Sequence, residues 1–323
     1  MRNRLSGKIN SKILNAKVFI HRNLNSFAYI KNVDSIKLSI SKFLFRYNLI
    51  SEKTFDTLLF RIRLKYKINW KNPKTFNEKI NYLKLYKRNP IYTQIVDKVA
   101  FKPYIADKLG LDYVIPTLGV WDNINDIDFK SLPSKYVIKC NHGSGKKFTF
   151  IVDKHTDVEK IKKIMRRSMR TNIYKNTGEW PYNDIKRKII AEEYIEDINP
   201  EHTLSDYKFF CFDGKPKFLQ ITTHLDNRKR FNFFNLSMEP LDYYALDFPP
   251  VNQKDLKKPT MLKEMISIAE KLSEGFPFIR VDLYNVENRI YVGELTFYPL
   301  SGYLRWKEKK TDLELGEFLN LGN

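Results

Sequence analysis

The sequence predicts an α+β protein in which antiparallel β-hairpins alternate with helices. Short segments with apolar residues at every second position flank turn residues, as in 206–212 and 217–222 around Asp213-Gly214. Helix signals separate these hairpins, and the order of elements differs from the regular strand–helix alternation of a parallel sheet. Of the 323 residues, 42% are hydrophobic and 14% are aromatic. The chain can therefore bury the core of one large or two ordinary domains.

The elements are expected in the following order. Residues 1–50 have the pattern of basic helices, and Thr75 with Glu78 forms a capping box that opens the next helix. Another helix is expected over residues 97–110, with Pro103 kinking or splitting it. The remaining elements are strands at 114–116, 136–140 and 148–152, a basic helix from Thr156 to about Arg170, strands at 189–195, 206–212 and 217–222, a helix over 260–275 and a terminal hairpin over 276–299. Thr156 and Glu159 form the capping box of the basic helix.

The formal net charge of +20 is concentrated near the N-terminus, where residues 1–70 carry 15 Lys and Arg against 3 Asp and Glu. This asymmetry predicts an acidic partner, such as an anionic membrane surface or an acidic polymer, unless it only reflects a biased genome. Nucleic acid is not expected as a partner, because no nucleic-acid-binding motif accompanies the charge. Residues 1–50 are expected either to contact the anionic inner face of a membrane or to pack on the main domain as a helical extension.

Cys140 and Cys211 each lie in a strand-like apolar run, which indicates buried, reduced thiols rather than a disulfide. No stretch approaches the roughly 18 apolar residues of a membrane span, and basic residues interrupt every candidate signal peptide. We therefore expect a cytoplasmic protein.

Two carboxylates in the terminal hairpin form a candidate metal site. Asp282 alternates with apolar residues on the first strand, and Glu294 lies twelve residues later on the second. An odd-length loop near Glu287 would put the two side chains opposite each other on one face of the hairpin. Mg²⁺ favours one or two carboxylates together with substrate phosphates. The alternative is a pair of solvated surface acids.

A Gly/Ser loop follows the strand that ends with Lys139. In the run Asn141-His142-Gly143-Ser144-Gly145-Lys146, glycines would let backbone N–H groups approach phosphate oxygens, and lysines would neutralise them. The spacing is not that of a Walker A loop. The alternative is an ordinary turn, because Gly-Ser-Gly is common in turns.

These features together resemble the ATP-grasp enzymes, and in particular the TupA-like ATP-grasp family of bacterial surface-polysaccharide and teichuronopeptide synthesis. The resemblance covers residues from about 55 to 320, so we expect an extension over 1–55 and an ATP-grasp domain over 56–323. The matching runs are Asn72-Pro-Lys-Thr-Phe-Asn-Glu78, Val137-Ile-Lys-Cys-Asn-His-Gly-Ser-Gly145, Asp206-Tyr-Lys-Phe-Phe-Cys-Phe-Asp-Gly214 and Gly293-Glu-Leu-Thr-Phe297.

The resemblance implies two cofactors, ATP and Mg²⁺. Lys98 and Lys139 would contact the ATP phosphates. The loop residues His142, Gly143, Ser144 and Gly145 would assist them, and Lys208 would reach the phosphates from its own strand. Asp282, Glu294 and Thr296 would hold the metal, although ATP-grasp enzymes commonly carry Asn at the position of Thr296.

The resemblance also implies a hinge that holds adenine. Glu192 would face the adenine amino group, while the Glu193 carbonyl and the Ile195 N–H would complete the hinge. Glu201 would bind the ribose, with Glu196 as a rival. Arg228 and Arg230, expected in a loop, would clamp the transferring phosphoryl group or an acidic substrate.

The activity implied by the resemblance is ATP-dependent carboxylate–amine ligation through an acyl phosphate. The substrates would be a uronic acid of a bacterial surface polysaccharide, or its precursor, and an amine or amino acid. A kinase acting on a sugar hydroxyl is the main alternative, because the ATP half of the site would be the same. A basic binding protein and a glycosyltransferase remain further alternatives, although the Asp-x-Asp spacing of a nucleotide-sugar site is missing.

Overall fold

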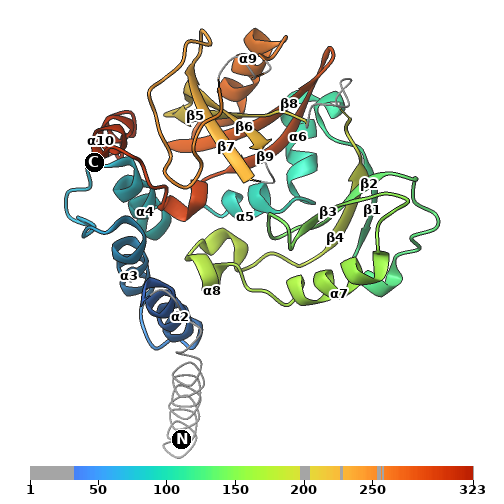
Figure 1. The fold of residues 1–323 in the computed structure, drawn as a ribbon, viewed down its shortest axis with the longest axis horizontal. Coiled ribbons are helices and arrows are strands. Elements are labelled where there is room, and N and C mark those ends of the chain that lie inside the picture. The colour runs from blue at the N-terminus through green and yellow to red at the C-terminus, as the bar shows by residue number, and fades with distance from the viewer. Residues whose placement is uncertain (1–32, 197–203, 226–227, 253–255, 257, 323) are drawn as a thin grey trace, which may run out of the picture.

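Two antiparallel sheets organise the chain in a computed structural model that describes residues 33–196, 204–225, 228–252, 256 and 258–322 (Figure 1). The four-stranded sheet has the order β1-β4-β2-β3, and the five-stranded sheet has the order β7-β6-β5-β8-β9. The strands are β1 (Thr117–Trp121), β2 (Tyr136–Cys140), β3 (Thr149–Val152), β4 (Ile189–Glu193), β5 (Asp206–Phe212), β6 (Lys215–Leu225), β7 (Arg228–Asn235), β8 (Phe278–Val286) and β9 (Arg289–Thr296). Mixed helices and antiparallel hairpins confirm the predicted α+β class.

Helices cover both faces of the five-stranded sheet. The helices are α2 (Val33–Arg46), α3 (Glu52–Leu64), α4 (Phe76–Tyr86), α5 (Ile91–Val96), α6 (Phe101–Leu109), α7 (Val158–Ser168), α8 (Tyr174–Thr177), α9 (Leu262–Ser273) and α10 (Lys309–Glu317). α9 packs its buried Met265 and Leu272 against one face. On the other face Phe76 of α4 contacts Phe212 and Phe278, with ring centroids 5.9 and 5.1 Å apart. The part of this second face that the helices leave uncovered carries the candidate site.

The four-stranded sheet forms a smaller core with α7. Ile161 and Met165 of α7 pack with Ile138 and Ile189 from two adjacent strands. Figure 1 shows this sheet beside the five-stranded sheet, with α5 and α6 between them. Cys140 in this sheet and Cys211 in the larger one are free and buried, as expected.

α2 and α3 pack together at the N-terminal end of the described chain. The rings of Phe45 and Phe55 stack with centroids 4.3 Å apart, and Phe45 also meets Tyr174. The expected boundary between residues 55 and 56 falls inside α3, and α2 packs on the main body. Residues 1–32, in which most of the expected basic helices lie, are outside the described residues. None of the described helices is long and apolar enough to cross a membrane.

Three local expectations were wrong for identifiable reasons. Pro103 does not kink its helix, because α6 begins only at Phe101 and its first turn tolerates proline. The strand expected at 114–116 begins only at Thr117, because Pro116 has no N–H to donate to the hydrogen bonds of a sheet. The side chain of Asp157 caps α7 by accepting from the Lys160 N–H at 3.0 Å, in place of the expected Thr156.

Candidate active site

A row of polar side chains crosses the uncovered face of the five-stranded sheet. Gln220, Lys208, Asp282 and Glu294 are successive cross-strand partners on β6, β5, β8 and β9. Because directly opposed residues share a face, all four side chains lie on one side of the sheet. The prediction that Asp282 and Glu294 oppose each other is confirmed.

The register that pairs these carboxylates depends on a β-bulge. The turn Glu287-Asn288 has two residues, and this even spacing alone would pair Asp282 with Gly293. The extra residue lies in a bulge at Gly293, not in the loop as expected, and it moves Glu294 into register. A Cβ atom at Gly293 would lie 2.6 Å from the Tyr284 ring, so this close approach favours glycine at the bulge.

Two cations bind the Asp282 carboxylate. Arg280 donates to both of its oxygens, with N–O distances of 2.6 and 2.7 Å, and Lys208 forms an ion pair with Oδ2. Burial alone would raise the pKa of Asp282, but the charges of Arg280 and Lys208 outweigh it and hold the pKa below its ordinary value. The same guanidinium donates to Oγ1 of Thr296 at 3.1 Å. Arg280 thus links two of the three metal candidates, Asp282 and Thr296.

A third carboxylate, Asp206, enters this network through Lys208. Lys208 forms ion pairs with both Asp206 and Asp282. Oδ1 of Asp206 is buried and has no hydrogen-bond partner within the described part of the chain. Burial raises the pKa of Asp206, the Lys208 charge opposes the rise, and the Asp282 charge adds to it. An unsatisfied buried oxygen beside a cavity indicates a place for a ligand.

A cavity of about 430 Å³ separates this row from the smaller sheet. Lys98 enters it from the segment between α5 and α6, with Nζ 3.8 Å from Oε1 of Glu294. Nζ of Lys98 is buried and makes no hydrogen bond among the described residues. The other lining residues are Ile115, Val137, Lys139, Ser144, Thr149, Ile151, Glu192, Glu193, Tyr194, Ile195, Leu204, Asp206, Lys208, His224, Asp282, Tyr284 and Gly293. The structure thus brings most of the predicted nucleotide residues to one cavity.

Glu192 is held differently from the expectation that it faces adenine. Its carboxylate forms ion pairs with Lys139 of the adjacent strand β2 and with Lys102 of α6, the latter at 2.8 Å. Burial would raise the pKa of Glu192, but these two lysines hold it below the ordinary value. The carboxylate therefore pairs with Lys139 and Lys102, and the backbone of Glu193 to Ile195 remains as the hinge candidate along the cavity wall.

A second cavity of about 450 Å³ adjoins the first, and Ser144, Asp206, Lys208 and Glu294 line both. Its other walls come from the Gly/Ser loop, from α8 and the segments beside it, from the strands of the large sheet, and from the segment that follows β9. These residues are Gly143, Gly145, Ile173, Thr177, Glu179, Tyr182, Phe210, Gln220, Lys229, Phe231, Arg280, Thr296, Tyr298, Pro299, Leu300, Ser301 and Leu304.

His142 does not line either cavity. It is buried, its Nε2 lies 3.3 Å from the Ser168 carbonyl, and its ring meets Phe148 edge-on. Burial, aided by the Arg187 charge, lowers the pKa of His142 to about 4. The neutral ring packs the loop against α7, so the expected phosphate contact of His142 is not supported.

The basic residues of β7 also differ from expectation. Arg228 and Arg230 lie on a strand, not in a loop, and pair with Leu225 and Thr223 of β6. Lys229 points to the opposite face and lines the second cavity. Side chains alternate between the two faces of a strand. The basic residue that faces the cavity is therefore Lys229, one position away from each of the expected arginines. Glu201, the ribose candidate, is outside the described residues.

The sequence reasoning missed several residues of the site. Arg280 could have been found, because residues two apart on a strand share a face and Asp282 was already a candidate. Asp206 bears the same relation to Lys208. Lys102 and Glu179 come from other elements, and no local pattern marks them.

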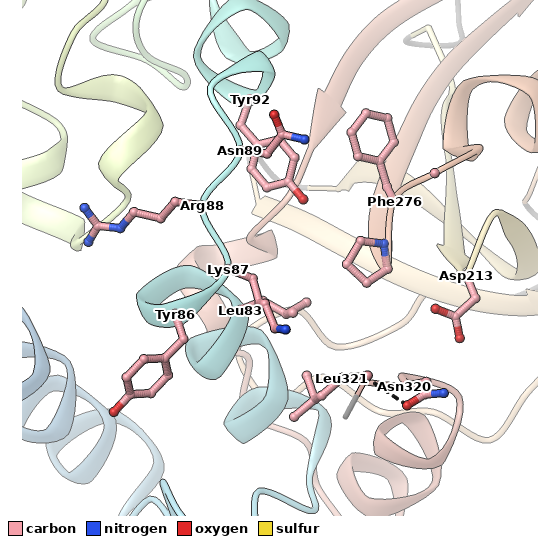
Figure 2. Close-up of a pocket in the computed structure, with 13 residues that line it drawn as sticks. Leu83, Tyr86, Lys87, Arg88, Asn89, Tyr92, Asp213, Phe276, Asn320 and Leu321 are labelled. Atoms are coloured by element: carbon pink, nitrogen blue, oxygen red, sulfur yellow. Dashed lines mark hydrogen bonds between the residues drawn. The ribbon is translucent and has the colours of Figure 1, made fainter.

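A further cavity of about 660 Å³ lies elsewhere (Figure 2). It is bounded by the segment after α4, the turn before β8 and residues 320–322. Lys87, Arg88, Asn89 and Phe276 are among its lining residues, and the Arg88 side chain also forms an ion pair with Glu52. No carboxylate pair faces this cavity, so it does not compete with the site between the sheets.

The donor set fits a magnesium ion that is completed by phosphate oxygens. Asp282, Glu294 and Thr296 offer oxygen atoms on adjacent strands, and Mg²⁺ takes one or two carboxylates beside substrate phosphates. Among the described residues no group of three or more His, Cys, Asp or Glu side chains could hold a metal by itself. Side chains from the described part of the chain therefore do not close a metal site on their own.

Several solved structures are similar to this chain at low sequence identity. Solved structures that resemble the chain include D-alanine–D-alanine ligase from Helicobacter pylori, with 19% identity, 76% of this chain and 69% of that chain covered, and a TM-score of 0.38. D-alanine–D-alanine ligase from Bacillus anthracis is 18% identical, with 63% of this chain and 57% of that chain covered and a TM-score of 0.37. The ADP complex of N5-carboxyaminoimidazole ribonucleotide synthetase is 12% identical, with 76% of this chain and 57% of that chain covered and a TM-score of 0.42. The chain thus spans less than two thirds of the latter two. No match is found among curated proteins.

A family model gives the assignment. The model of the TupA-like ATP-grasp family matches residues 78–320, well over half of the chain. The match includes both sheets and every candidate site residue named above. The chain therefore belongs to the TupA-like ATP-grasp family of ATP-dependent enzymes.

Proposed function

We propose that this protein is an ATP-dependent carboxylate–amine ligase that works through an acyl phosphate. The observation that carries the proposal is the opposed pair Asp282 and Glu294, on one face with Arg280 and Lys208, between two adjoining cavities. One cavity suits a nucleotide and the other an acceptor. Phosphoryl transfer requires positioning and charge stabilisation more than covalent participation by the protein, and this arrangement supplies both.

The nucleotide would lie in the first cavity. Ile115, Val137, Ile151 and Leu204 give it apolar walls that suit an adenine ring. The polar end, near Lys98 and Lys139, suits the phosphates. Asp282, Glu294 and Thr296 would hold Mg²⁺, which when bound offsets charge on the β- and γ-phosphates. Lys208 and Arg280 would then exchange part of their contact with Asp282 for phosphate oxygens.

The acceptor carboxylate would lie where the two cavities meet. Its oxygen attacks the γ-phosphorus of ATP, the bond to the β-phosphate oxygen breaks, and ADP leaves with the electron pair. Arg280 and Lys208 favour the negative charge that spreads over the transferring group. An amine then displaces phosphate from the acyl phosphate, and the product is an amide.

The acidic substrate is proposed to be a uronic acid of a bacterial surface polysaccharide or of its precursor, and the amine an amino acid or another primary amine. Family membership and three cations at the second cavity, Lys208, Lys229 and Arg280, support an acidic acceptor. We propose a cytoplasmic protein, where ATP is available, with the basic N-terminal segment contacting the anionic inner membrane face. Removal of residues 1–32 is the suitable test of that contact, because α2 packs against α3.

The test is Mg²⁺-dependent ATP turnover with a mixture of hexuronic acids and amino acids, resolving ADP, AMP and phosphate. ADP plus phosphate that requires both an acid and an amine is expected. Glu294→Ala should lower this rate by about 100-fold or more, whereas Glu270→Ala, an exposed acid on α9, should not change it. ADP with a phosphorylated sugar and no need for an amine would replace the ligase by a kinase. Unchanged turnover in Glu294→Ala would refute the metal assignment.

A further inference from the structure

The second cavity carries opposite charges on its two sides. Lys208, Lys229 and Arg280 project into it from strands of the large sheet. Glu179 faces it from the segment between α8 and β4, which is not part of that sheet. An acidic acceptor and its acyl phosphate fit the cationic side. The acidic side is therefore free to bind a second, cationic substrate.

Glu179 differs from the other acids of this cavity in its partners. Asp206 is paired with Lys208, and Glu294 lies 3.8 Å from Lys98. Glu179 forms no ion pair within the described part of the chain, and its Oε1 accepts a hydrogen bond from Oγ of Ser301 at 2.6 Å. Burial raises the pKa of Glu179 to about 7. A carboxylate placed like this is stabilised when a cation enters the cavity.

Ser301 lies in a turn with unusual backbone geometry. Leu300, Ser301 and Gly302 have φ angles of 48°, 60° and 76°, so three successive residues are left-handed. Left-handed conformations cost roughly 1–2 kcal/mol for each residue other than glycine. Such strain persists only where the surrounding structure fixes it, and it concentrates at ligand sites.

Polar residues of α4 fix this turn. Nζ of Lys84 donates to the Ser301 carbonyl at 3.1 Å, and Nδ2 of Asn81 donates to the Gly302 carbonyl at 2.8 Å. Asn77 donates to the carbonyl of Leu304 and accepts from its N–H, at 2.9 and 3.1 Å. These positions, four and three residues apart, lie on one face of the helix. α4 thus holds Ser301 against Glu179.

We propose that Glu179, oriented by Ser301, binds the amine co-substrate and accepts its proton. The inference rests on the proposed ligase function and assigns the second half of its reaction. A primary amine arrives as an ammonium ion, which the cations of the sheet repel and the carboxylate of Glu179 attracts. The amine would therefore meet the acyl phosphate from the side opposite Lys229 and Arg280.

The reaction step balances as follows. The ammonium transfers one proton to the Glu179 carboxylate and becomes a neutral amine. The amine nitrogen forms a bond to the acyl carbon, and the bond from that carbon to the phosphate oxygen breaks with its electron pair on phosphate. The second proton of the nitrogen leaves with phosphate, so the products are an amide and hydrogen phosphate. Glu179 then returns its proton to solvent.

Hydroxylamine separates the two half-reactions. It is largely neutral near pH 7, needs no proton acceptor, and traps an acyl phosphate as a hydroxamate. The experiment measures ATP-dependent hydroxamate formation from the hexuronic acid mixture, and separately the ADP release that depends on the amino acid mixture. It compares the wild type with Glu179→Gln, which keeps an acceptor for Ser301, and with Glu314→Gln. Glu314 also accepts a hydroxyl hydrogen bond, from Tyr243, but lies outside both cavities.

Glu179→Gln should form hydroxamate within about 2-fold of the wild-type rate while its amine-dependent rate falls by about 100-fold or more, the usual contribution of a positioned base. Glu314→Gln should change neither rate. A normal amine-dependent rate in Glu179→Gln, or a parallel loss of both rates, would overturn the assignment of Glu179. A wild type that forms no hydroxamate with any acid would overturn the ligase proposal and this inference with it.

Discussion

Replacement of Lys84 by methionine should destabilise the protein strongly, although Lys84 lies outside both site cavities. Its ammonium nitrogen lies 3.0 Å from Oδ1 of Asp56, 3.1 Å from the Ser301 carbonyl and 3.2 Å from the Tyr303 hydroxyl. The two charged side chains are 0% and 3% exposed. Methionine has a similar length but removes the charge and all three donors. The variant therefore leaves a buried carboxylate without its cation.

Removal of one partner of a buried ion pair typically costs about 3–5 kcal/mol. At roughly 2–4 °C for each kcal/mol, this lowers the melting temperature by about 6–20 °C. The deficit should also depend on pH. Burial already raises the pKa of Asp56, and it rises further without Lys84. The folded variant then holds a proton that the unfolded chain releases, so its stability falls as pH rises.

The assay is thermal unfolding followed by circular dichroism at pH 5 and pH 8. The matched control is Lys271→Met, an exposed lysine of α9, which should stay within 2 °C of the wild type. The double variant Asp56→Asn, Lys84→Met should recover part of the loss, because it removes the unpaired charge. A decrease below 2 °C in Lys84→Met, or a deficit that grows as pH falls, would refute the reasoning.

Three further changes test the rest of the site. Lys229→Ala should raise the KM of the acidic acceptor about 10-fold or more, whereas Arg230→Ala on the opposite face should not; equal effects would contradict the strand register. Gly293→Ala brings a Cβ atom within 2.6 Å of the Tyr284 ring and should cost about 1–3 kcal/mol while it reduces turnover; normal turnover with normal stability would argue against the bulge. Burial would raise the pKa of Glu192, but two lysines hold this pKa below its ordinary value. The ion pairs of Glu192 should therefore stabilise the fold fully above the ordinary pKa, and this stabilisation should be lost as pH falls through the lowered pKa. Glu192→Gln should therefore flatten the acid side of the melting-temperature profile, and a slope like that of the wild type would exclude this contribution.

The carboxylate pair could be predicted from the sequence because everything that sets it is local. Asp282 and Glu294 belong to one hairpin, and alternation along each strand fixes the face on which each side chain lies. Even here the extra residue was expected in the turn, whereas it lies at Gly293. The sequence predicts that one extra residue is needed to bring the two carboxylates opposite each other, but only the strand pairing shows that this residue is Gly293.

Arg228, Arg230 and Lys229 show where local reasoning fails. All three are basic and consecutive, and their faces depend on the residue at which β7 pairs with β6. The alternation Phe231-Asn232-Phe233 follows directly, but it fixes their faces only if the strand extends back to Arg228, and a loop was expected there. Glu179 lies in a segment without periodic pattern, so its approach to Ser301, 122 residues later, follows from tertiary packing alone.

Two irregular segments of the backbone, both in the last third of the chain, place the chemistry. The bulge at Gly293 turns Glu294 toward the first cavity, and the left-handed turn at Leu300–Gly302 presents Ser301 to the second. The first lies against the Tyr284 ring of its own hairpin, and the second is held by the polar face of α4. This explains why the run Asn72–Glu78 matters to a site that it does not touch. Its Thr75 and Glu78 begin α4 and its Asn77 binds Leu304, so the start of this helix sets the position of the turn.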